Sequence, residues 1–529
     1  MDCNIFRRCQ HSGDTVLIGR GFWRSDSTES RRSRTPINAI DAQSSTDRIE
    51  TVLRELVGQY AFVTSVDSGY VFGVDRIQSI PLYYSLLDDR IVVSDDQQYL
   101  RDRIELDERD PLSVEEYRAL GFVTGPHSLY PSLKQIEAGT LVHFDGNTIN
   151  RSRYFEYQYS SDGVRTQNAL DRVVRKVFSR LVEVADGRPI WVPLSGGLDS
   201  RLALSILKRM GYDNLHAFSY GADDNPESKV SKRVAASLDI DWHFVEYTHS
   251  RWRSWYLSEA REEYDRSLEA TITPHLREWP AVKGLRDRGV LPDDAVIVPG
   301  HTGDMVAGGH LEPQICNSDS VRPKRVANAI LSKFYSWNRD ISNEEALRKR
   351  LRERYVPEEA VSGEEAAEAI ERWDWSERQA KHITNHVRPY DFWDVDWWMP
   401  FWDAEFFEFW LNVPLEQRLG KEFYDHYVVS VYTDTAEDPV RTVDSADSLT
   451  DRIRRSVGNS SFRPLVEPLY DSYRTFTTEK AWFADEKAWN RPLCRHGMMK
   501  REMFGEHFNG DHNFRSYRAR ERLGEIFFE

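Results

Sequence analysis

Residues 190–200 read Ile190-Trp191-Val192-Pro193-Leu194-Ser195-Gly196-Gly197-Leu198-Asp199-Ser200. The first five form a short apolar run, as expected for a buried strand of a parallel sheet. Apolar residues then recur at helical spacing from Leu202 to Leu207, and Gly211 marks the end of the predicted helix. The stretch therefore predicts a strand, a glycine-rich turn and a helix in direct succession.

The turn between this strand and helix has the chemistry of an anion-binding loop. Gly196 and Gly197 let backbone N–H groups approach an anion closely, and the helix N-terminus adds a favourable dipole. Ser195 and Ser200 supply hydroxyl donors, and Asp199 supplies a carboxylate suited to Mg²⁺. The absence of a following Lys argues against the GxxxxGK[ST] phosphate loop. An ordinary glycine-rich turn is the alternative, but the whole hexapeptide after a strand favours a pyrophosphate-binding loop.

The composition is that of a globular chain. With 529 residues, about two to four domains are expected, each with an ample core. Hydrophobic residues make up 40% and aromatic residues 12%, which excludes a disordered chain. The net charge of −16 argues against a nucleic-acid-binding protein, because phosphate contacts need a basic face.

Cysteine usage and hydropathy predict a reduced, cytoplasmic protein. The four cysteines (Cys3, Cys9, Cys316 and Cys494) form no CxxC pair, so neither a zinc site nor a disulfide framework is indicated. There is no apolar run of about eighteen residues and no signal-peptide core, so no membrane partner is expected. The oligomeric state stays open, a homodimer included.

The pattern along the chain predicts an α/β protein in three parts. Residues 1–155 are rich in short strand candidates, and the polar stretch 25–35 within them is predicted to be a loop. Residues 165–310 alternate strand and helix, which predicts a doubly wound parallel sheet with ligands at the carboxyl ends of its strands. Residues 325–430 are predicted to be helical, with densely placed tryptophans that are better explained by packing than by base stacking. Residues 431–529 are predicted to form a helical extension of unknown role.

The hexapeptide Ser195–Ser200 resembles the pyrophosphate loop of the N-type ATP pyrophosphatases, and its flanks narrow the resemblance to the asparagine synthetase family. The similarity runs from about residue 15 to about residue 430. These enzymes split ATP into AMP and pyrophosphate while they activate a carboxylate. The resemblance implies an ATP pyrophosphatase domain over residues 165–430, with ATP and Mg²⁺ as cofactors.

A second segment, Pro299-Gly300-His301-Thr302-Gly303-Asp304, resembles the family's Ser-Gly-Glu-Gly-(Ser/Ala)-Asp. By this resemblance Asp304 is a ligand of Mg²⁺ and pyrophosphate, and Gly300 contacts the nucleotide. His301 replaces a glutamate that handles the acyl acceptor. A histidine there either serves as a base near neutral pH or is an ordinary loop residue, and the change weakens the case for aspartate as the substrate.

Two cations downstream also match the family by position. The segment Asp396–Asp403 resembles Glu-x-Arg-x-Pro-Phe-Leu-Asp, although Trp398 replaces the arginine. Arg388 falls by spacing where the family has a phosphate-binding lysine. Gly420-Lys421 resembles the Gly-Lys that stabilises the adenylate. The alternative for Arg388 and Lys421 is a solvated surface cation.

The predicted site thus has three groups of residues. The catalytic candidates are Lys421, Arg388 and His301, and the metal ligands are Asp199 and Asp304. The residues expected to contact ATP and pyrophosphate are Leu194, Ser195, Gly196, Gly197, Leu198, Asp199, Ser200, Phe218, Tyr220 and Gly300. Of these, Leu194, Phe218 and Tyr220 are assigned to the adenine, although a buried strand would have the same sequence pattern.

The N-terminal part resembles a class-II glutamine amidotransferase domain that has lost its catalytic residues. Glutamine-dependent members begin with Cys directly after Met, because the nucleophile needs a free α-amino group as its base. Here Asp2 follows Met1, Cys3 comes one place late, and Ile18 stands where an oxyanion asparagine belongs. Only Asp47 resembles the glutamine-binding aspartate. We therefore expect a truncated, degenerate domain over residues 1–155 without glutaminase activity.

The resemblance implies an AMP-forming ligase. It would adenylate a small-molecule or peptide carboxylate and transfer ammonia or an amine to form an amide, as asparagine synthetase does. One alternative is an intramolecular cyclase of the β-lactam synthetase or lasso-peptide cyclase type, which needs no ammonia. Another is a catalytically silent nucleotide-binding scaffold.

Overall fold

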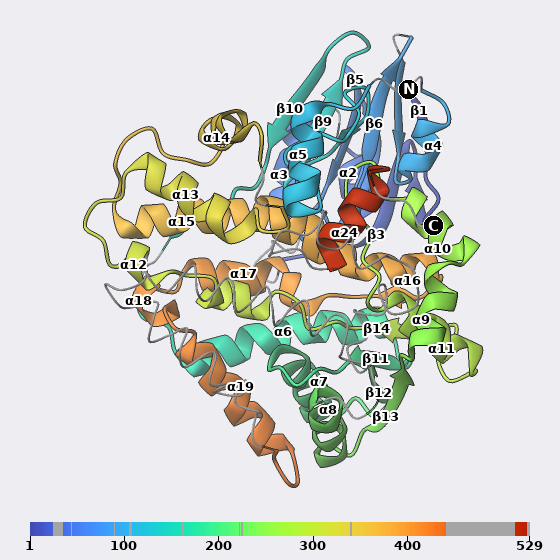
Figure 1. Ribbon diagram of the computed structural model, residues 1–529, viewed down its shortest axis with the longest axis vertical. Helices are drawn as coiled ribbons and strands as arrows, with labels where there is room; N and C mark the ends of the chain where they lie inside the picture. The colour runs from blue at the N-terminus through green and yellow to red at the C-terminus, as the bar shows by residue number, and fades with distance from the viewer. Residues whose placement is uncertain are drawn as a thin grey trace.

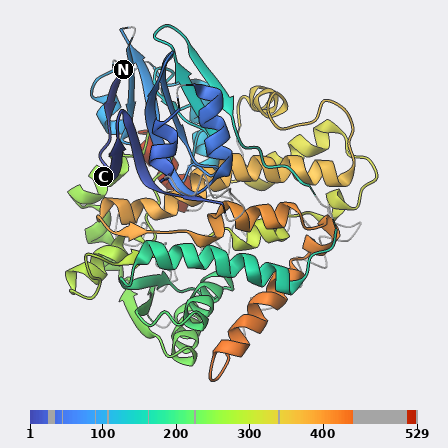
Figure 2. The ribbon, with the colours of Figure 1, turned by 180° about the vertical axis from the view of Figure 1, so that it is seen from behind.

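The computed structural model describes residues 1–24, 35–43, 45–88, 90–104, 108–160, 163–221, 223, 226–338, 341–440 and 514–525. Nearly all of the predicted loop at residues 25–35 and most of the extension at 431–529 lie outside these ranges. Two N-terminal sheets lie at one end of the molecule and a parallel sheet at the other (Figure 1). Helices including α15, α16 and α17 lie between them, as the reverse view also shows (Figure 2). The α/β class predicted from the sequence is confirmed.

The N-terminal part consists of a six-stranded antiparallel sheet, in the order β10-β9-β5-β4-β3-β2, and a four-stranded sheet, in the order β1-β7-β6-β8. Strand β4 shows how the layers form. Ala61 and Val63 face the four-stranded sheet, whereas Tyr60 and Phe62 face helices α2 and α3. Both sets are buried because successive side chains of a strand point to opposite faces. The bounds are β1 Asp2–Asn4, β2 Cys9–Ser12, β3 Thr15–Trp23, β4 Leu56–Val66, β5 Gly69–Val74, β6 Tyr83–Leu87, β7 Arg90–Ser94, β8 Lys134–Gln135, β9 Thr140–Phe144 and β10 Ile149–Arg153.

The third sheet has five parallel strands in the order β13-β12-β11-β14-β15. They are β11 Ile190–Pro193, β12 Leu215–Gly221, β13 Asp241–Glu246, β14 Val296–Ile297 and β15 Asp396–Trp397. The chain winds outward from β11 in both directions, so the loops after β11 and β14 diverge at a topological switch point, where such sheets bind ligands. Strand β15 corrects the prediction that residues 325–430 are helical throughout: Asp396 and Trp397 pair with β14.

Helices cover the sheets and connect the N-terminal part with the parallel sheet. Helices α7 and α8 pack on the parallel sheet, and α19 packs on α7. In the N-terminal part the helices are α2 Pro36–Asp41, α3 Thr46–Glu55, α4 Gln97–Arg101 and α5 Pro111–Leu120. Those that follow are α6 Gln167–Ala185, α7 Asp199–Arg209, α8 Pro226–Ser237, α9 His249–Tyr256, α10 Glu259–Arg266, α11 Trp279–Asp287, η1 Met305–Gly309, α12 Pro313–Cys316, α13 Pro323–Phe334, α14 Glu344–Arg352, α15 Gly363–Trp373, η2 Asp374–Ile383, η3 Thr384–Val387, α16 Arg388–Phe392, η4 Pro400–Trp402, α17 Ala404–Leu411, α18 Leu415–Arg418, α19 Glu422–Thr435 and α24 Phe514–Arg522.

A single hydrophobic core crosses from the N-terminal part into the parallel-sheet part. Val57, Ile77 and Phe122 belong to the same buried cluster as Trp375 and Phe407. The tryptophans between residues 373 and 410 mostly serve this core, and Trp373, Trp375, Trp402 and Trp410 are almost completely buried. In the stretch 393–402, Trp398 and Trp402 are buried, which agrees with the predicted packing, whereas Trp393 and Trp397 keep partial exposure. Within the described ranges, no helix has the length and apolarity needed to cross a membrane.

Candidate active site

The predicted pyrophosphate loop follows β11 and is fixed at its start by backbone contacts. The N–H of Leu194 donates to the carbonyl of Phe218 at 2.8 Å. The Leu194 carbonyl in turn accepts from the hydroxyls of Ser219, at 2.6 Å, and Ser231, at 2.8 Å. These contacts tie the beginning of the loop to β12 and α8, so the position of the following residues is set by the sheet.

The loop is closed by its own hydroxyls and leaves its glycines open. The N–H of Gly197 donates to Ser195 Oγ at 3.1 Å, and the N–H of Ser195 donates to Ser200 Oγ at 3.3 Å. A Cβ added at Gly196 would have no protein atom nearer than 3.9 Å. Gly196 is therefore not required by packing of the protein itself, and the open space suits an anion at the N-terminus of α7.

The second segment packs directly against this loop through two glycines. A Cβ at Gly300 would lie 2.5 Å from the Ser200 nitrogen, and one at Gly303 would lie 2.5 Å from the Tyr424 hydroxyl. Between them, Thr302 has a φ of 79°, which is unusual for a β-branched residue. Its hydroxyl donates to Gln379 Oε1 at 2.8 Å and accepts from the indole N–H of Trp402. These buried contacts hold a strained backbone at the centre of the site.

The arrangement brings two carboxylates together. The N–H of Asp304 donates to Asp199 Oδ2 at 3.2 Å, and the Tyr424 hydroxyl donates to Asp199 Oδ1 at 2.8 Å. The pKa of Asp199 is raised to about 7, first by burial and then by the charge of Asp304, while the Tyr424 hydrogen bond and Lys421 act in the opposite direction. A divalent cation would relieve this repulsion.

The residues present fit Mg²⁺ held jointly with a nucleotide. Mg²⁺ is usually bound by one or two carboxylates together with substrate phosphates and water. Across the described residues, no group of three or more His, Cys, Asp or Glu side chains could hold a metal ion by itself. Asp199 and Asp304 therefore match a site that a triphosphate completes.

Lys421 lies beside these carboxylates at the start of α19. Gly420 and Lys421 have φ values of 80° and 65°, and this turn sets the direction of the helix that carries Tyr424. The ammonium is 3.2 Å from Asp425 Oδ1 and contributes to the electrostatic field at Asp199. The structure thus brings Asp199, Asp304 and Lys421 together, as the sequence predicted.

Arg388 is held elsewhere. It is buried on α16, where its guanidinium donates to the carbonyl of Ser79 at 2.5 Å and pairs with Asp391 at 2.8 Å. Both partners lie on the side of the molecule that faces the N-terminal sheets. The predicted phosphate contact of Arg388 gains no support from these interactions and stays a prediction.

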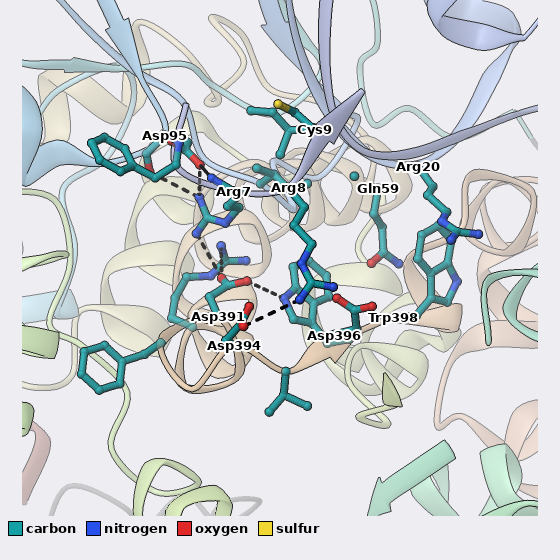
Figure 3. Close-up of a pocket in the computed structure, with 18 of the residues that line it drawn as sticks. Arg7, Arg8, Cys9, Arg20, Gln59, Asp95, Asp391, Asp394, Asp396 and Trp398 are labelled. Carbon is teal, nitrogen blue, oxygen red and sulfur yellow. Dashed lines mark hydrogen bonds and ion pairs between the residues drawn. The ribbon is translucent and has the colours of Figure 1, made fainter. Parts of the chain in front are cut away.

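A cavity of about 690 Å³ lies between the N-terminal part and residues 391–398 (Figure 3). Arg7 bridges Asp95, at 3.2 Å, and Asp391, at 3.1 Å, and Arg8 lies 3.7 Å from Asp394. Arg7 and Arg8 thus pair with aspartates of the other part, Asp391 and Asp394. Its lining also includes Cys9, Ile18, Arg188, Asp396 and Trp398. Residues 391–395 precede β15, so the cavity is at the amino end of that strand, whereas the predicted pyrophosphate loop is at the carboxyl end of β11.

The cysteine nearest the N-terminus is not an activated nucleophile. Cys3 lies on β1 beside β7, and burial, Asp95 and Asp2 together raise the pKa of its thiol to about 11. Asp47, the residue that resembles a glutamine-binding aspartate, is exposed at the start of α3. A thiol of such high pKa is almost entirely protonated at neutral pH and is a poor nucleophile.

The adenine candidates are placed by β12. Phe218 is completely buried in the core, and the Tyr220 ring stacks on Tyr247 with ring centroids 5.4 Å apart. The Tyr220 hydroxyl donates to Glu278 at 3.3 Å. Their side chains therefore serve packing, so recognition of adenine by backbone groups of β12 stays a prediction. Leu198 precedes α7 and packs against the core.

His301 lies in a group of histidines from distant parts of the chain. Its ring meets that of His386 edge to face with centroids 4.7 Å apart, and His386 stacks on His275 at 3.8 Å. Burial lowers the pKa of His301 to about 4, although Asp304 acts in the opposite direction. Burial and neighbouring histidines hold the pKa of His386 well below its ordinary value. His301 and His386 are therefore neutral at pH 7.

Sequence reasoning missed Tyr424, His386 and His275. Tyr424 follows Lys421 by three residues and lies on the same helix, a spacing that signals a shared face. His386 follows His382 by four residues, which gives the same kind of signal. His275 has no such signal, because its partners are distant in sequence.

Comparison with known proteins agrees with this geometry. Residues 173–428 match the family model described as asparagine synthase. The chain is 27% identical over 206 residues to the glutamine-hydrolyzing asparagine synthetase 1 of Bacillus subtilis, a match that covers 36% of this chain and 31% of that protein. It is 22% identical over 279 residues to the putative glutamine-hydrolyzing asparagine synthetase 2 of Methanocaldococcus jannaschii, covering 49% and 51%. The matches thus span about half or less of these relatives.

Among solved structures, an NH3-dependent NAD synthetase from Campylobacter jejuni is similar over 28% of this chain and 61% of that one. The sequence identity is 15% and the TM-score is 0.21.

Proposed function

Because residues 173–428 match the asparagine synthase family model, we propose that the chain is an ATP-dependent ligase that forms AMP and pyrophosphate. It adenylates a carboxylate and joins it to ammonia or an amine. The observation that carries the proposal is the meeting of Asp199, Asp304 and Lys421 at the ends of β11 and β14. A chain without this function would have no reason to keep two half-buried carboxylates side by side.

The triphosphate would lie on the loop that follows β11. Backbone N–H groups at Gly196 and Gly197 and the N-terminus of α7 would bind the departing pyrophosphate. Mg²⁺, held by Asp199 and Asp304, would neutralise charge on the phosphates. A carboxylate oxygen of the substrate attacks the α-phosphorus, forming a new P–O bond while the P–O bond to pyrophosphate breaks. Lys421 would stabilise the negative charge that develops on the adenylate.

The second half-reaction transfers the acyl group to nitrogen. The nitrogen forms a bond with the acyl carbon, the C–O bond to AMP breaks, and AMP leaves with the electron pair. The protonated Cys3 thiol supports an enzyme that takes its nitrogen from solution or from an amine substrate, not from glutamine. Arg388 has no part in this proposal, because Ser79 and Asp391 already engage it.

The proposal is tested by carboxylate-dependent exchange of labelled pyrophosphate into ATP, with aspartate included in a panel of carboxylates. We expect exchange with at least one acid, and its loss in Asp199→Asn and Asp304→Asn. ATP binding that depends on Mg²⁺ but never leads to exchange, with or without an amine present, would identify a silent scaffold instead. A product that forms without ammonia and is lighter than its substrate by one water would identify an intramolecular cyclase.

A further inference from the structure

The histidine row, defined as His275, His301 and His386, is a feature that the ligase proposal leaves unexplained. We infer that His386 and His301 together bind the nitrogen nucleophile and accept its proton during amide formation. The inference rests on the proposed function, since it assigns the acceptor side of the same site. The ligand class is an uncharged nitrogen with N–H groups, namely ammonia or the head of a primary amine.

Geometry is the first support. The row combines three separate parts of the chain: the segment before α11, the segment after β14 and η3. His386 is in the middle, 3.8 Å from the His275 ring and 4.7 Å from the His301 ring. His301 is three residues from Asp304, so one end of the row reaches the carboxylates that would hold the nucleotide.

Unused hydrogen-bonding capacity is the second support. The Nε2 atoms of His301 and His386 are buried and have no hydrogen-bond partner. Such atoms are rare in folded proteins, because an unpaired buried polar group costs free energy. Both residues nevertheless keep partial exposure. A small N–H donor would satisfy these nitrogens.

The charges around the row favour an uncharged ligand. Three groups outside the row act on it electrostatically: Arg277, Asp304 and His382, the last of which lies on η2. Neutral imidazoles offer lone pairs to an uncharged amine. They offer no counter-charge to an ammonium ion, for which Asp304 is the single nearby anion among these groups. A metal ion is not the missing partner, because the described residues hold no suitable group of three or more ligands.

The proton step follows from the chemistry of acyl transfer. When the nitrogen bonds to the acyl carbon it becomes positively charged and strongly acidic, so a weak base suffices to deprotonate it. One N–H proton moves to an imidazole nitrogen of the row, and the C–O bond to AMP breaks. Because the imidazoles are neutral at rest, the row then returns the proton to solvent and is ready for the next cycle.

The test compares two nucleophiles in His386→Phe and His386→Gln. Hydroxylamine is a weaker base than ammonia and is largely uncharged at neutral pH, so it depends less on a protein base. We expect amide formation from ammonia to fall about a hundredfold while hydroxamate formation and pyrophosphate exchange stay near wild type. His243→Phe is the control outside the row: its ring stacks on Trp191 with ring centroids 4.9 Å apart, and its ratio of amide to hydroxamate should equal that of wild type.

The outcomes separate the two proposals. Exchange in a variant proves that it folds and adenylates, so a lost amide signal then reflects the acceptor half-reaction. Parallel loss of amide and hydroxamate, or loss of neither, would overturn the role of His386. Absence of exchange in the wild-type enzyme would instead overturn the ligase proposal itself.

Discussion

A methyl group on Gly300 would lie 2.5 Å from the backbone nitrogen of Ser200. At this point the segment after β14 and the start of α7 therefore approach each other backbone to backbone. This contact brings Asp304 to Asp199, and it requires glycine because of space and not because of an unusual φ. A substitution there must push the two carboxylates apart.

Gly300→Ala should therefore abolish pyrophosphate exchange. The displaced loop would also lower the free energy of unfolding by about 1–3 kcal/mol, as overpacking does. Exchange kinetics and urea unfolding measure the two effects. Wild-type exchange in this variant would contradict the close contact.

Gly196→Ala is the matched contrast, because its Cβ would have no protein atom nearer than 3.9 Å. We expect the stability of this variant to change little. Its affinity for ATP should fall at least tenfold, because the new methyl group would occupy the space in which we expect a phosphate to bind. Isothermal titration with ATP and Mg²⁺ checks this. Unchanged affinity would show that the anion does not approach this glycine.

Binding of Mg²⁺ and ATP should depend on pH through Asp199, whose pKa in the free protein is about 7. A protonated carboxyl cannot bind the cation, so affinity should rise as the pH increases toward 8 and fall about tenfold per unit below 7. In the absence of ligand the sign for stability is opposite. Because the folded state favours the protonated carboxyl, stability should decrease as the pH rises from about 4 to 7.

Tyr424→Phe tests how the Tyr424 hydroxyl affects the ionisation of Asp199. The variant loses a 2.8 Å hydrogen bond to the ionised form of Asp199, so the pKa of Asp199 should rise further. The midpoint of the pH dependence of Mg²⁺-ATP binding should move upward by about one unit or more, since such bonds contribute about 1.5–3 kcal/mol. A midpoint that does not move would show that the hydroxyl does not stabilise the charge.

Glu377 should contribute strongly to stability, because it joins the two parts of the chain through hydrogen bonds. It accepts from the N–H of Gly125, the Tyr355 hydroxyl and the Lys381 ammonium. Burial alone would raise its pKa, but Lys381, Arg354 and these hydrogen bonds lower it to about 2. Its stabilisation should therefore be present above about pH 4.5 and be lost as the pH falls toward 2.

Glu377→Gln should lower the free energy of unfolding by about 3–5 kcal/mol, because it leaves the Lys381 charge buried without its partner. The double variant Glu377→Leu/Lys381→Met removes both charges and should recover part of this loss. Thermal unfolding at pH 7 measures both. Equal destabilisation of the single and double variants would mean that packing, and not charge, dominates at this position.

The sequence was sufficient for the parts of the site that are local. The loop after β11 and the segment 299–304 each carry their glycines and acidic residues within six positions, so their chemistry is readable before folding. Lys421 was readable for the same reason, through the preceding Gly420. The strand candidates of the N-terminal part were readable because alternate residues are buried on two faces of one sheet.

The features that the sequence did not predict depend on tertiary contacts. The two residues of β15 lie among tryptophans that suggest a helix, and only pairing with β14 makes them a strand. Arg388 has the charge and spacing expected of a phosphate ligand. However, Asp391 lies three residues further on the same helix and forms an ion pair with its guanidinium. His275, His301 and His386 are separated by more than twenty residues each, so no periodicity connects them.

The continuous core described above also bears on how such a chain can evolve. Since Val57, Ile77 and Phe122 pack in one cluster with Trp375 and Phe407, deleting the N-terminal part would leave a large apolar face open to water. A descendant that lost the N-terminal part would lose the cover of its own core. The two parts must then be inherited together, and a gene for residues 163–529 alone should yield protein that aggregates.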